Sequence, residues 1–414
     1  MPDNPPRVAI VAGLRTPFVK AGTVFRRHSP LKLASHAVAG LLDRHQVDPA
    51  GIDELVYGIV LCDPRIPNLA REIVFNTPLP AGVRAHTVSN NCITGIHAVT
   101  ALHDAIVSGR AEAGIAGGVE SMSNPAVLFR PRAARRFLDF AMARGLGARL
   151  KRALALRPGD FLPAMPQIAE PSTGLSMGEH TELIAKEWKI ARAEQDRIAY
   201  ASHMNAAAAA GRLRDEIHPL DGIDRDLLVR PDASLERLAQ LKPVFDRSPA
   251  GTLTAGNSSP LTDGASAVLL MSEERARREG REPLAFIRDF EYAAIDPRDG
   301  LLMAPAVAVP RLLARAGLRL ADMDIVEMHE AFGAQVLANL AAWERGWKEP
   351  AIGMVDRARL NPLGGSIAVG HPFSATGGRI VTSLANEMRR RGARYGLISI
   401  CAAGAMAAAM ILER

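Results

Sequence analysis

Along this chain, short unbroken runs of apolar residues alternate with stretches in which apolar positions recur every three or four residues. The unbroken runs are typical of buried strands, and the periodic stretches are typical of helices with one buried face. In the N-terminal third the predicted elements are, in order, strand 7–12, helix 31–45, strands 53–61 and 85–91, helix 93–109 and strand 113–116. Because strands and helices alternate, we predict βαβ units and a mainly parallel sheet.

The C-terminal third repeats this order of elements. The predicted elements are helix 306–317, strand 323–328, a loop at 370–376 that opens a helix ending near 391, and strand 395–401. The spacing between Gly95 and Gly109 equals that between Gly378 and Gly392, and each pair encloses a predicted helix. We interpret the chain as a duplicated α/β unit, with a chance similarity between βα units as the alternative.

The segment between these halves has a different composition. Residues 127–157 contain nine basic residues and one acid, a net charge of +8, whereas the whole chain carries +6. Its large apolar residues recur every four positions, at Leu138, Met142, Leu146, Leu150 and Leu154. This spacing predicts an apolar stripe on one helix, or on two short helices because Gly145 and Gly147 weaken the middle. The stripe either packs on the protein's own body or offers a surface to an anionic membrane or a partner subunit.

Beyond the basic segment the chain first forms a loop and then returns to helices. Prolines that indicate the loop stand at Pro158, Pro163, Pro166 and Pro171. Helices are predicted over 177–188 and 192–210, the second ended by Gly211.

The composition indicates which class of protein the chain belongs to and in which compartment it works. The chain has 414 residues, of which 48% are hydrophobic and 23% charged, which is typical of a globular enzyme of two or three domains. Its three cysteines, Cys62, Cys92 and Cys401, form an odd set without metal-ligand spacing. This argues for a reducing compartment and against a disulfide framework or a metal site. The N-terminus resembles neither a signal peptide nor a transit peptide, so we expect a cytoplasmic protein.

One stretch is long enough to be considered as a membrane helix. Residues 395–412 are 18 residues without a charge. The stretch is rich in alanine and glycine, however, and is interrupted by Ser399, Cys401 and Gly404. We predict two buried strands joined by a tight turn instead.

Cys92 stands where a predicted strand gives way to a predicted helix. The run 88–96 reads VSNNCITGI, and helical spacing begins at Ile93. A cysteine here lies among the first backbone N–H groups of the helix, which with the helix dipole stabilise negative charge. We therefore expect the Cys92 thiol to be shifted towards the nucleophilic thiolate. The alternative is a small buried residue, as most free cysteines are.

Five stretches, spread over nearly the whole chain, together resemble the motifs of the thiolase superfamily. They are NCITG at 91–95, GGVESMS at 117–123, GTLTAGNSS at 251–259 with DGA at 263–265, NPLGG at 361–365 with GHP at 370–372, and CAAG at 401–404. The resemblance implies an α/β thiolase fold: two similar βαβ-type halves with mixed central sheets packed as layers, plus an inserted, mainly helical loop domain. The implied domains are 1–124 with 251–275, the insertion 125–250, and 276–414.

The same resemblance implies chemistry on 3-ketoacyl-CoA thioesters. Joining or splitting them needs a nucleophile, a base to activate it, an acid/base for a carbon and donors for two oxyanions. By resemblance Cys92 is the acylated nucleophile, His371 is its base and Cys401 is the acid/base at carbon. The backbone N–H groups of Cys92 and Ala403 would hold the oxyanion of the covalent intermediate. Cys62 lies in none of the motifs and is taken as structural.

The chain departs from the family pattern in three places. Many thiolases read Asn-Glu-Ala-Phe where this chain has His329 in HEAF, and His329 can donate directly from a ring N–H. This form, with the basic segment, resembles the β subunit of the fatty-acid oxidation trifunctional complex and its bacterial relatives. Alanines replace several glycines at 402–407, so any position there that needs a positive φ is strained. Ser374 replaces a usual glycine, which we expect to be harmless at a helix start.

Coenzyme A is expected as a substrate, with no tightly bound cofactor and no metal. By resemblance, Ser259 would contact the pantetheine amides and Arg230 would lie near the adenine or the phosphates. For Arg230 the alternative is a solvated surface charge.

These features predict a degradative 3-ketoacyl-CoA thiolase of fatty-acid β-oxidation that forms a homodimer or a larger assembly. A subunit that carries the hydratase and dehydrogenase steps is a candidate partner. The alternatives are a biosynthetic acetyl-CoA acetyltransferase and a non-catalytic acyl-CoA- or lipid-binding relative. The presence of Cys92, His371 and Cys401 argues against the non-catalytic relative. Nucleic-acid binding is not expected, because the basic segment lacks the aromatic stacking pattern of single-strand binders.

Overall fold

The computed structural model describes residues 7–164 and 169–414. Its N-terminal half contains β1 (Val8–Arg15), β2 (Val19–Lys20), α1 (Pro30–Arg44), β3 (Glu54–Gly58), α2 (Leu69–Phe75), β4 (Arg84–Val88), α3 (Thr94–Val107), β5 (Ala113–Ser121) and, after an insertion, β8 (Thr262–Ser272) and α10 (Glu273–Arg278). The strands and helices predicted here are present, and β5 extends well beyond the predicted 113–116.

The C-terminal half also matches the predicted order. It contains β9 (Ala285–Ala294), α11 (Pro305–Ala316), β10 (Ile325–Met328), α12 (Gly333–Arg345), α13 (Ser366–Val369), α14 (Ala375–Arg391), β11 (Tyr395–Ala402) and β12 (Met406–Glu413). β11 and β12 form an antiparallel hairpin in which Cys401 pairs with Ala407, so 395–412 is two buried strands as predicted. Within the described ranges, no helix is both long and apolar enough to cross a membrane.

The insertion is mainly helical, as predicted. It contains β6 (Leu128–Phe129), α4 (Pro131–Met142), α5 (Leu146–Ala153), β7 (Pro163–Ala164), α6 (Met177–Glu187), α7 (Arg192–Ala208), α8 (Ala210–Asp215) and α9 (Leu235–Ala239). The basic segment forms two short helices, separated at Gly145, whose φ is +85°. Gly211 does not end α7, because α8 follows at once and includes it; a helical glycine costs only ~1 kcal/mol. Of the four loop prolines, Pro166 lies outside the described residues.

Apart from the separate pair β6–β7, the strands of the described residues form one mixed sheet in the order β10-β11-β12-β9-β1-β8-β5-β3-β4, with β2 on β8. Among the strand pairs of the described ranges, three are parallel (β3 with β4, β3 with β5, and β10 with β11) and the others are antiparallel. The prediction of a mainly parallel sheet is therefore wrong. A tight turn can join only antiparallel strands, as between β11 and β12, and β8 returns from the insertion antiparallel to both β1 and β5.

The two halves share one strand order. In the N-terminal half β3, β5, β8 and β1 lie side by side, and in the C-terminal half β10, β11, β12 and β9 do. In each set the first pair is parallel and the next two pairs are antiparallel. The halves join where β1 pairs with β9 over the three residues Val8–Ile10. The predicted pair of similar halves is confirmed, although its two sheets are continuous at this seam.

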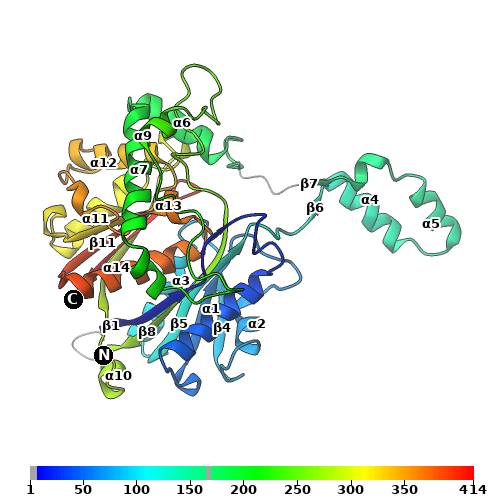
Figure 1. Ribbon diagram of the computed structural model, residues 1–414. Helices are drawn as coiled ribbons and strands as arrows, with labels where there is room; N and C mark the ends of the chain where they lie inside the picture. Colours follow the sequence, from blue (N-terminus) through cyan, green and yellow to red (C-terminus); the bar gives the residue numbers. More distant parts are fainter. Residues whose placement is uncertain (1–6, 165–168) are drawn as a thin grey trace.

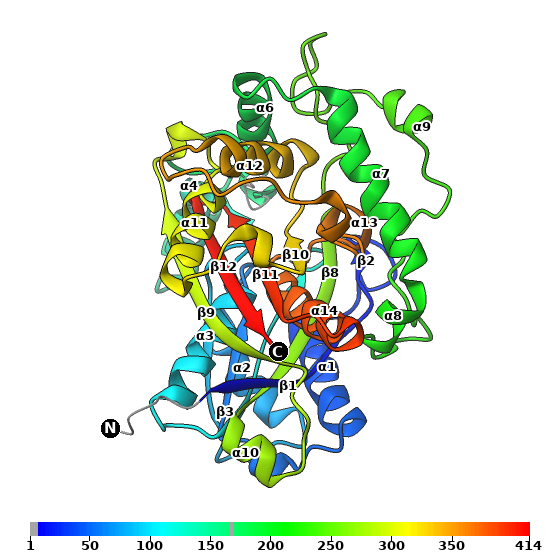
Figure 2. The ribbon, with the colours of Figure 1, turned by 90° about the vertical axis from the view of Figure 1, so that its left-hand side faces the viewer.

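Helices lie on both faces of the sheet (Figures 1 and 2). α1 and α2 pack on the N-terminal half, and α11 and α12 pack on the C-terminal half. α3 and α14 lie together between the halves. They approach closely through glycines, since a Cβ on Gly95 would lie only 2.5 Å from the backbone oxygen of Ser374. This crossing fixes the start of α3 against the start of α14.

Candidate active site

The start of α3 holds Cys92 in a tight, tied-down loop. Asn91 adopts a left-handed conformation with φ +48°. Thr94 Oγ1 accepts from the Asn90 backbone N–H at 2.7 Å and donates to the Asn91 carbonyl at 2.6 Å. Asn91 Nδ2 donates to the carbonyl of Ala403 at 3.0 Å. The nucleophile loop is therefore bonded to the turn between β11 and β12, more than three hundred residues later in the chain.

That turn brings Cys401 and Ala403 to Cys92. Cys401 is buried at the end of β11, and the backbone N–H of Ala403 donates towards the Cys92 sulfur. Gly404, with φ +77°, keeps a glycine where the turn is left-handed, and its N–H donates to Glu170 Oε2 at 2.8 Å. The next residue, Ala405, has φ +55° and is fully buried. The expected strain of an alanine at a positive φ is thus confirmed at this one position.

Two histidines meet at the site from different elements. His329 follows β10 and His371 precedes α14, and their ring centroids lie 4.1 Å apart. His371 Nδ1 lies 2.7 Å from Thr376 Oγ1, and its backbone N–H donates to Thr262 Oγ1 at 3.0 Å. The Nε2 atoms of both rings are buried and have no hydrogen-bond partner within the described part of the chain. Each ring therefore keeps one nitrogen free for a reacting group.

His329 is oriented by a chain of polar contacts. Its Nδ1 lies 2.8 Å from Ser366 Oγ, which in turn accepts from Arg379 Nη2 at 3.0 Å. Since Arg379 can only donate, the serine hydroxyl proton is free to point at Nδ1. The His329 proton then resides on Nε2, the nitrogen without a partner. Neither Ser366 nor Arg379 stood out in the sequence, although both lie close to motif residues.

Burial sets the protonation of the site. It lowers the pKa of His371 to about 3 and raises the pKa of Cys92 to about 12. Burial also lowers the pKa of His329 and raises the pKa of Cys401, each far from its ordinary value. The expected shift of Cys92 towards thiolate is wrong. A helix N-terminus contributes ~0.3–1 kcal/mol, and the Ala403 N–H also lowers the pKa, but the lost hydration outweighs both. At neutral pH the thiols of Cys92 and Cys401 and the imidazoles of His329 and His371 are therefore all neutral.

Ser374 has a larger role than a harmless helix start. It is fully buried, and its hydroxyl donates to the Val119 carbonyl at 2.6 Å and lies 3.2 Å from Glu120 Oε2. Glu120, of the GGVESMS motif, also accepts from the backbone N–H groups of Val60 and Leu61, at 3.2 and 2.8 Å. Burial raises the pKa of Glu120 to about 7. These contacts tie the His371 loop to β5, a role that sequence reasoning missed.

Hydrogen bonds also connect the NPLGG motif to the HEAF motif. Asn361 has φ +45°, and its Nδ2 donates to Glu330 Oε1 at 2.7 Å. Glu330 Oε2 accepts from Ser202 Oγ of α7 at 2.7 Å. A Cβ on Gly365 would lie 2.1 Å from the Glu330 carboxyl carbon, so this glycine makes room for the carboxylate. The network fixes the loop that carries His329.

The two predicted coenzyme A residues lie in different surroundings. Ser259 is half-buried, and its backbone N–H donates to the carbonyl of Ala331, two residues after His329. Arg230 is exposed on the loop between α8 and α9, and its backbone N–H donates to His203 Nδ1 at 3.2 Å. Cys62, taken as structural, is exposed, and its thiol donates weakly to the Ile59 carbonyl. The structure thus groups Cys92, Cys401, Ala403, His371 and His329, with Ser259 adjoining them.

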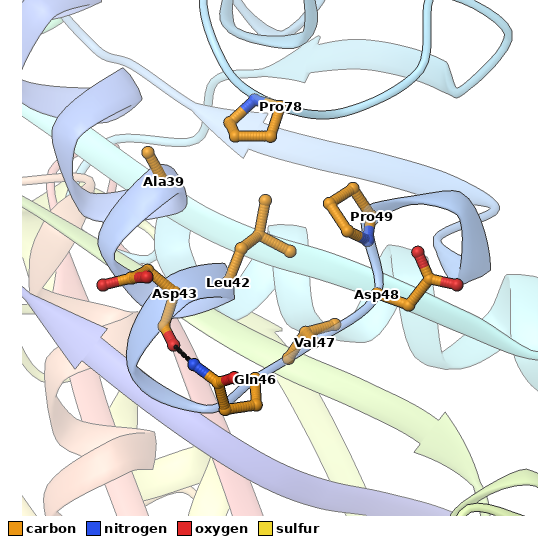
Figure 3. Close-up of a pocket in the computed structure, with 8 residues that line it drawn as sticks. All are labelled: Ala39, Leu42, Asp43, Gln46, Val47, Asp48, Pro49 and Pro78. Atoms are coloured by element: carbon orange, nitrogen blue, oxygen red, sulfur yellow. Dashed lines mark hydrogen bonds between the residues drawn. The ribbon is translucent and has the colours of Figure 1, made fainter.

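Of two hollows on the described part of the surface, one borders the site. The first, shown in Figure 3, lies at the end of α1 and is lined by Ala39, Leu42, Asp43, Gln46, Val47, Asp48, Pro49 and Pro78. It contains none of the predicted site residues. The second lies beside the nucleophile loop, where Asn90, Ile93 and Met406 are among its lining residues.

Comparisons with known proteins agree with this geometry. The family model "Thiolase, N-terminal domain" matches residues 8–274, and "Thiolase, C-terminal domain" matches residues 281–414. The chain is 46% identical to a 3-ketoacyl-CoA thiolase of Pectobacterium carotovorum, with 98% of this chain and 96% of that protein covered. It is 45% identical to a 3-ketoacyl-CoA thiolase of Colwellia psychrerythraea, with 98% and 97% covered.

Solved structures show the same fold. An acetyl-CoA acetyltransferase of Bacillus anthracis superposes with a TM-score of 0.84 at 30% identity and covers 99% of both chains. The human mitochondrial 3-ketoacyl-CoA thiolase superposes with a TM-score of 0.83 at 30% identity and covers 99% of this chain and 98% of its own.

Proposed function

The chain belongs to the thiolase family, and we propose that it cleaves 3-ketoacyl-CoA with coenzyme A into acetyl-CoA and an acyl-CoA shortened by two carbons. One observation carries this proposal: the Cys92 loop is bonded to the turn that follows Cys401, and the His329 backbone N–H is bonded to Ser399, two residues before Cys401. The His371 ring lies 4.1 Å from that of His329, and the Nε2 atoms of both rings are buried and free within the described residues. Nucleophile, base and carbon acid/base are then all present in one site.

In the first half-reaction Cys92 attacks the C3 carbonyl of the substrate, and His371 Nε2 takes the thiol proton. For this, Nδ1–H of His371 donates to Thr376 Oγ1, which leaves Nε2 as the acceptor. The C2–C3 bond then breaks, and the enolate of acetyl-CoA takes a proton from the Cys401 thiol. Acetyl-CoA leaves, and the remaining acyl group is a thioester on Cys92.

In the second half-reaction the thiol of coenzyme A attacks this thioester and gives its proton to the Cys401 thiolate. The tetrahedral intermediate collapses, and the released Cys92 thiolate recovers its proton from the His371 imidazolium. Because both thiols and both imidazoles begin neutral, each charge arises only when substrate is in place. The enclosed site then makes hydrogen bonds to the developing charge strong.

Two sets of donors stabilise the oxyanions. The backbone N–H groups of Cys92 and Ala403 hold the oxygen of the tetrahedral intermediate on Cys92. His329 Nε2–H donates to the thioester oxygen that becomes the enolate, and Ser366 and Arg379 fix the required tautomer. Each such donor is worth ~3–4 kcal/mol in the transition state.

Coenzyme A enters as a substrate, with no tightly bound cofactor. Ser259, whose backbone N–H is bonded to the Ala331 carbonyl near His329, contacts the pantetheine amides, and the exposed Arg230 attracts the phosphates.

The three free cysteines support a reducing, cytoplasmic setting. The relatives named 3-ketoacyl-CoA thiolase, at 46% and 45% identity over nearly the full length, support a degradative role in β-oxidation over that of a biosynthetic acetyl-CoA acetyltransferase. A homodimer or larger assembly is part of the same proposal. A hydratase/dehydrogenase subunit remains a candidate partner. We also propose the division into an N-terminal half (1–124 with 251–275), an inserted loop domain (125–250) and a C-terminal half (276–414).

The test is covalent trapping combined with chain-length profiling. After a pulse of 3-ketoacyl-CoA without free coenzyme A, intact-protein mass should show one acyl group on the wild type and none on Cys92→Ala. Cys401→Ala should become acylated from acyl-CoA but fail to exchange the α-protons of acetyl-CoA. Turnover by Cys92→Ala, or wild-type exchange by Cys401→Ala, would overturn the assignment. Thiolysis confined to acetoacetyl-CoA would favour the acetyltransferase role.

A further inference from the structure

A carboxylate of the insertion reaches the turn between β11 and β12 that carries Ala403. Glu170 Oε2 accepts from the backbone N–H of Gly404 at 2.8 Å, although the two residues are 234 positions apart in the chain. None of the proposed catalytic roles uses this contact, and Glu170 lies in none of the five motifs. The contact joins the insertion directly to the proposed oxyanion site.

The bonded N–H belongs to a peptide unit that is held on both sides. This unit carries the Ala403 carbonyl and the Gly404 N–H, which point in opposite directions because the peptide is planar and trans. The carbonyl accepts from Asn91 Nδ2 at 3.0 Å, and the N–H donates to Glu170. The nucleophile loop and the insertion therefore hold the same peptide unit from opposite sides.

The local conformation of the turn does not by itself fix this unit. Gly404 has φ +77°, and glycine adopts positive and negative φ about equally readily. Ala405, with φ +55°, is strained. A half-rotation of the unit would turn the Ala403 carbonyl towards the Glu170 carboxylate, so that two acceptors face each other, and the N–H towards the Asn91 donor. The two side chains thus disfavour the rotated form.

The Glu170 carboxylate is itself held in place by the backbone around it. The Glu170 N–H donates to the Leu175 carbonyl at 2.8 Å, and the Glu170 carbonyl accepts from the Gly174 N–H at 2.8 Å. Oγ1 of Thr173, in the same turn, lies 2.6 Å from Nε2 of the buried His180 in α6. The turn is therefore anchored to the start of α6 and presents the carboxylate from a fixed backbone.

The neighbouring peptide unit supplies the proposed oxyanion donor. The Ala403 N–H, which donates towards the Cys92 sulfur, lies on the unit directly before the one that Glu170 binds. Rotation of the second unit would shift the first and would separate the Asn91 side chain from the Ala403 carbonyl. Oxyanion donors act through their fixed placement, and a displacement of ~1 Å lowers a rate by ~10².

We infer that Glu170 is a positioning residue that acts through the Gly404 N–H and keeps the Ala403 N–H directed at the oxyanion on Cys92. The inference rests on the proposed function and adds to it a residue of the insertion. The role needs an acceptor atom and not a negative charge. Glutamine can therefore take it over, whereas alanine cannot.

Two reactions of the same enzyme separate this role from a general loosening of the site. Thiolysis needs the Ala403 N–H in both half-reactions, whereas exchange of the α-protons of acetyl-CoA depends on Cys401 and His329. Glu170→Ala should lower kcat for thiolysis about thirty- to hundredfold, with KM and the exchange rate within about threefold of the wild type. Retained exchange also verifies that this variant folds. Glu170→Gln should keep kcat within about threefold, because its amide oxygen still accepts from the Gly404 N–H.

The matched control is Glu187→Ala, which removes the same charge from an exposed site at the end of α6 and should behave as the wild type in both reactions. Three results would overturn the inference: an unchanged kcat in Glu170→Ala, equal losses of thiolysis and exchange in that variant, or a loss in Glu170→Gln as large as in Glu170→Ala. If the wild type neither cleaves 3-ketoacyl-CoA nor becomes acylated, the proposed function fails and the positioning role fails with it. An active wild type with an equally active Glu170→Ala removes the positioning role alone.

Discussion

A close approach of α3 and α14 lies next to the proposed nucleophile, and a single added methyl group tests it. Gly95 is in the first turn of α3, three residues after Cys92. A Cβ at this position would lie 2.5 Å from the Ser374 oxygen and 3.0 Å from the backbone nitrogen of Gly377. These neighbours are main-chain atoms at the start of α14, so they cannot rotate away. Gly95→Ala should therefore push α3 and α14 apart.

The size of the effect follows from the contact distances. Ordinary van der Waals contact with a Cβ begins at 3.4 Å, so the two helix starts must separate by close to 0.9 Å. Overpacking of this kind costs ~1–3 kcal/mol of unfolding free energy. Cys92 belongs to one helix start and His371 to the other. A displacement of ~1 Å between reacting groups lowers the rate by ~10². We expect a kcat about a hundredfold lower, with KM much less affected.

Steady-state thiolysis and urea unfolding measure the two effects separately. The matched control is Gly211→Ala in α8, where an added Cβ meets no atom within 4 Å. This control should keep full activity and gain up to ~1 kcal/mol in stability. If Gly95→Ala retains kcat within twofold and unfolds at the wild-type urea concentration, the crossing does not hold the site and the reasoning fails.

Three further predictions concern the titrating groups. His329→Ala should lower kcat by roughly 10²–10³ and Ser366→Ala by a smaller factor, and an unchanged kcat in both would make His329 a packing residue. Inactivation by iodoacetamide, measured in a Cys62→Ser background to remove the exposed thiol, should accelerate steadily from about pH 7 to about pH 10, because burial raises the pKa of Cys92 to about 12. A plateau reached by about pH 7 would instead reveal a resting thiolate. Burial lowers the pKa of His371 to about 3, below the ~6.5 of an unfolded histidine, so protonation in this window favours the unfolded chain. The unfolding free energy should thus fall on acidification from about pH 6.5 to about pH 3 more steeply for the wild type than for His371→Gln, and parallel urea-derived curves would contradict this.

Local patterns in the sequence determined most of the elements and the members of the site. Apolar periodicity predicted α3, α14 and the β11–β12 hairpin, because it depends only on residues a few positions apart. The motifs predicted which of the three cysteines and which histidines come together. The break of the basic segment into α4 and α5 followed from Gly145, which alone supplies the left-handed turn.

The direction of strands and the electrostatics of the site depended on partners far along the chain. β8 is antiparallel to β1 and β5 because of where the insertion returns it, and no local pattern records that. The Cys92 pKa rises because atoms from the β11–β12 turn and other distant segments exclude water, whereas the sequence showed only the helix start that acts in the opposite direction. Periodicity likewise predicted an apolar stripe at Leu138–Leu154 but not what it faces. Only the tertiary structure, by holding α4 and α5 away from the body, decided that this stripe meets solvent.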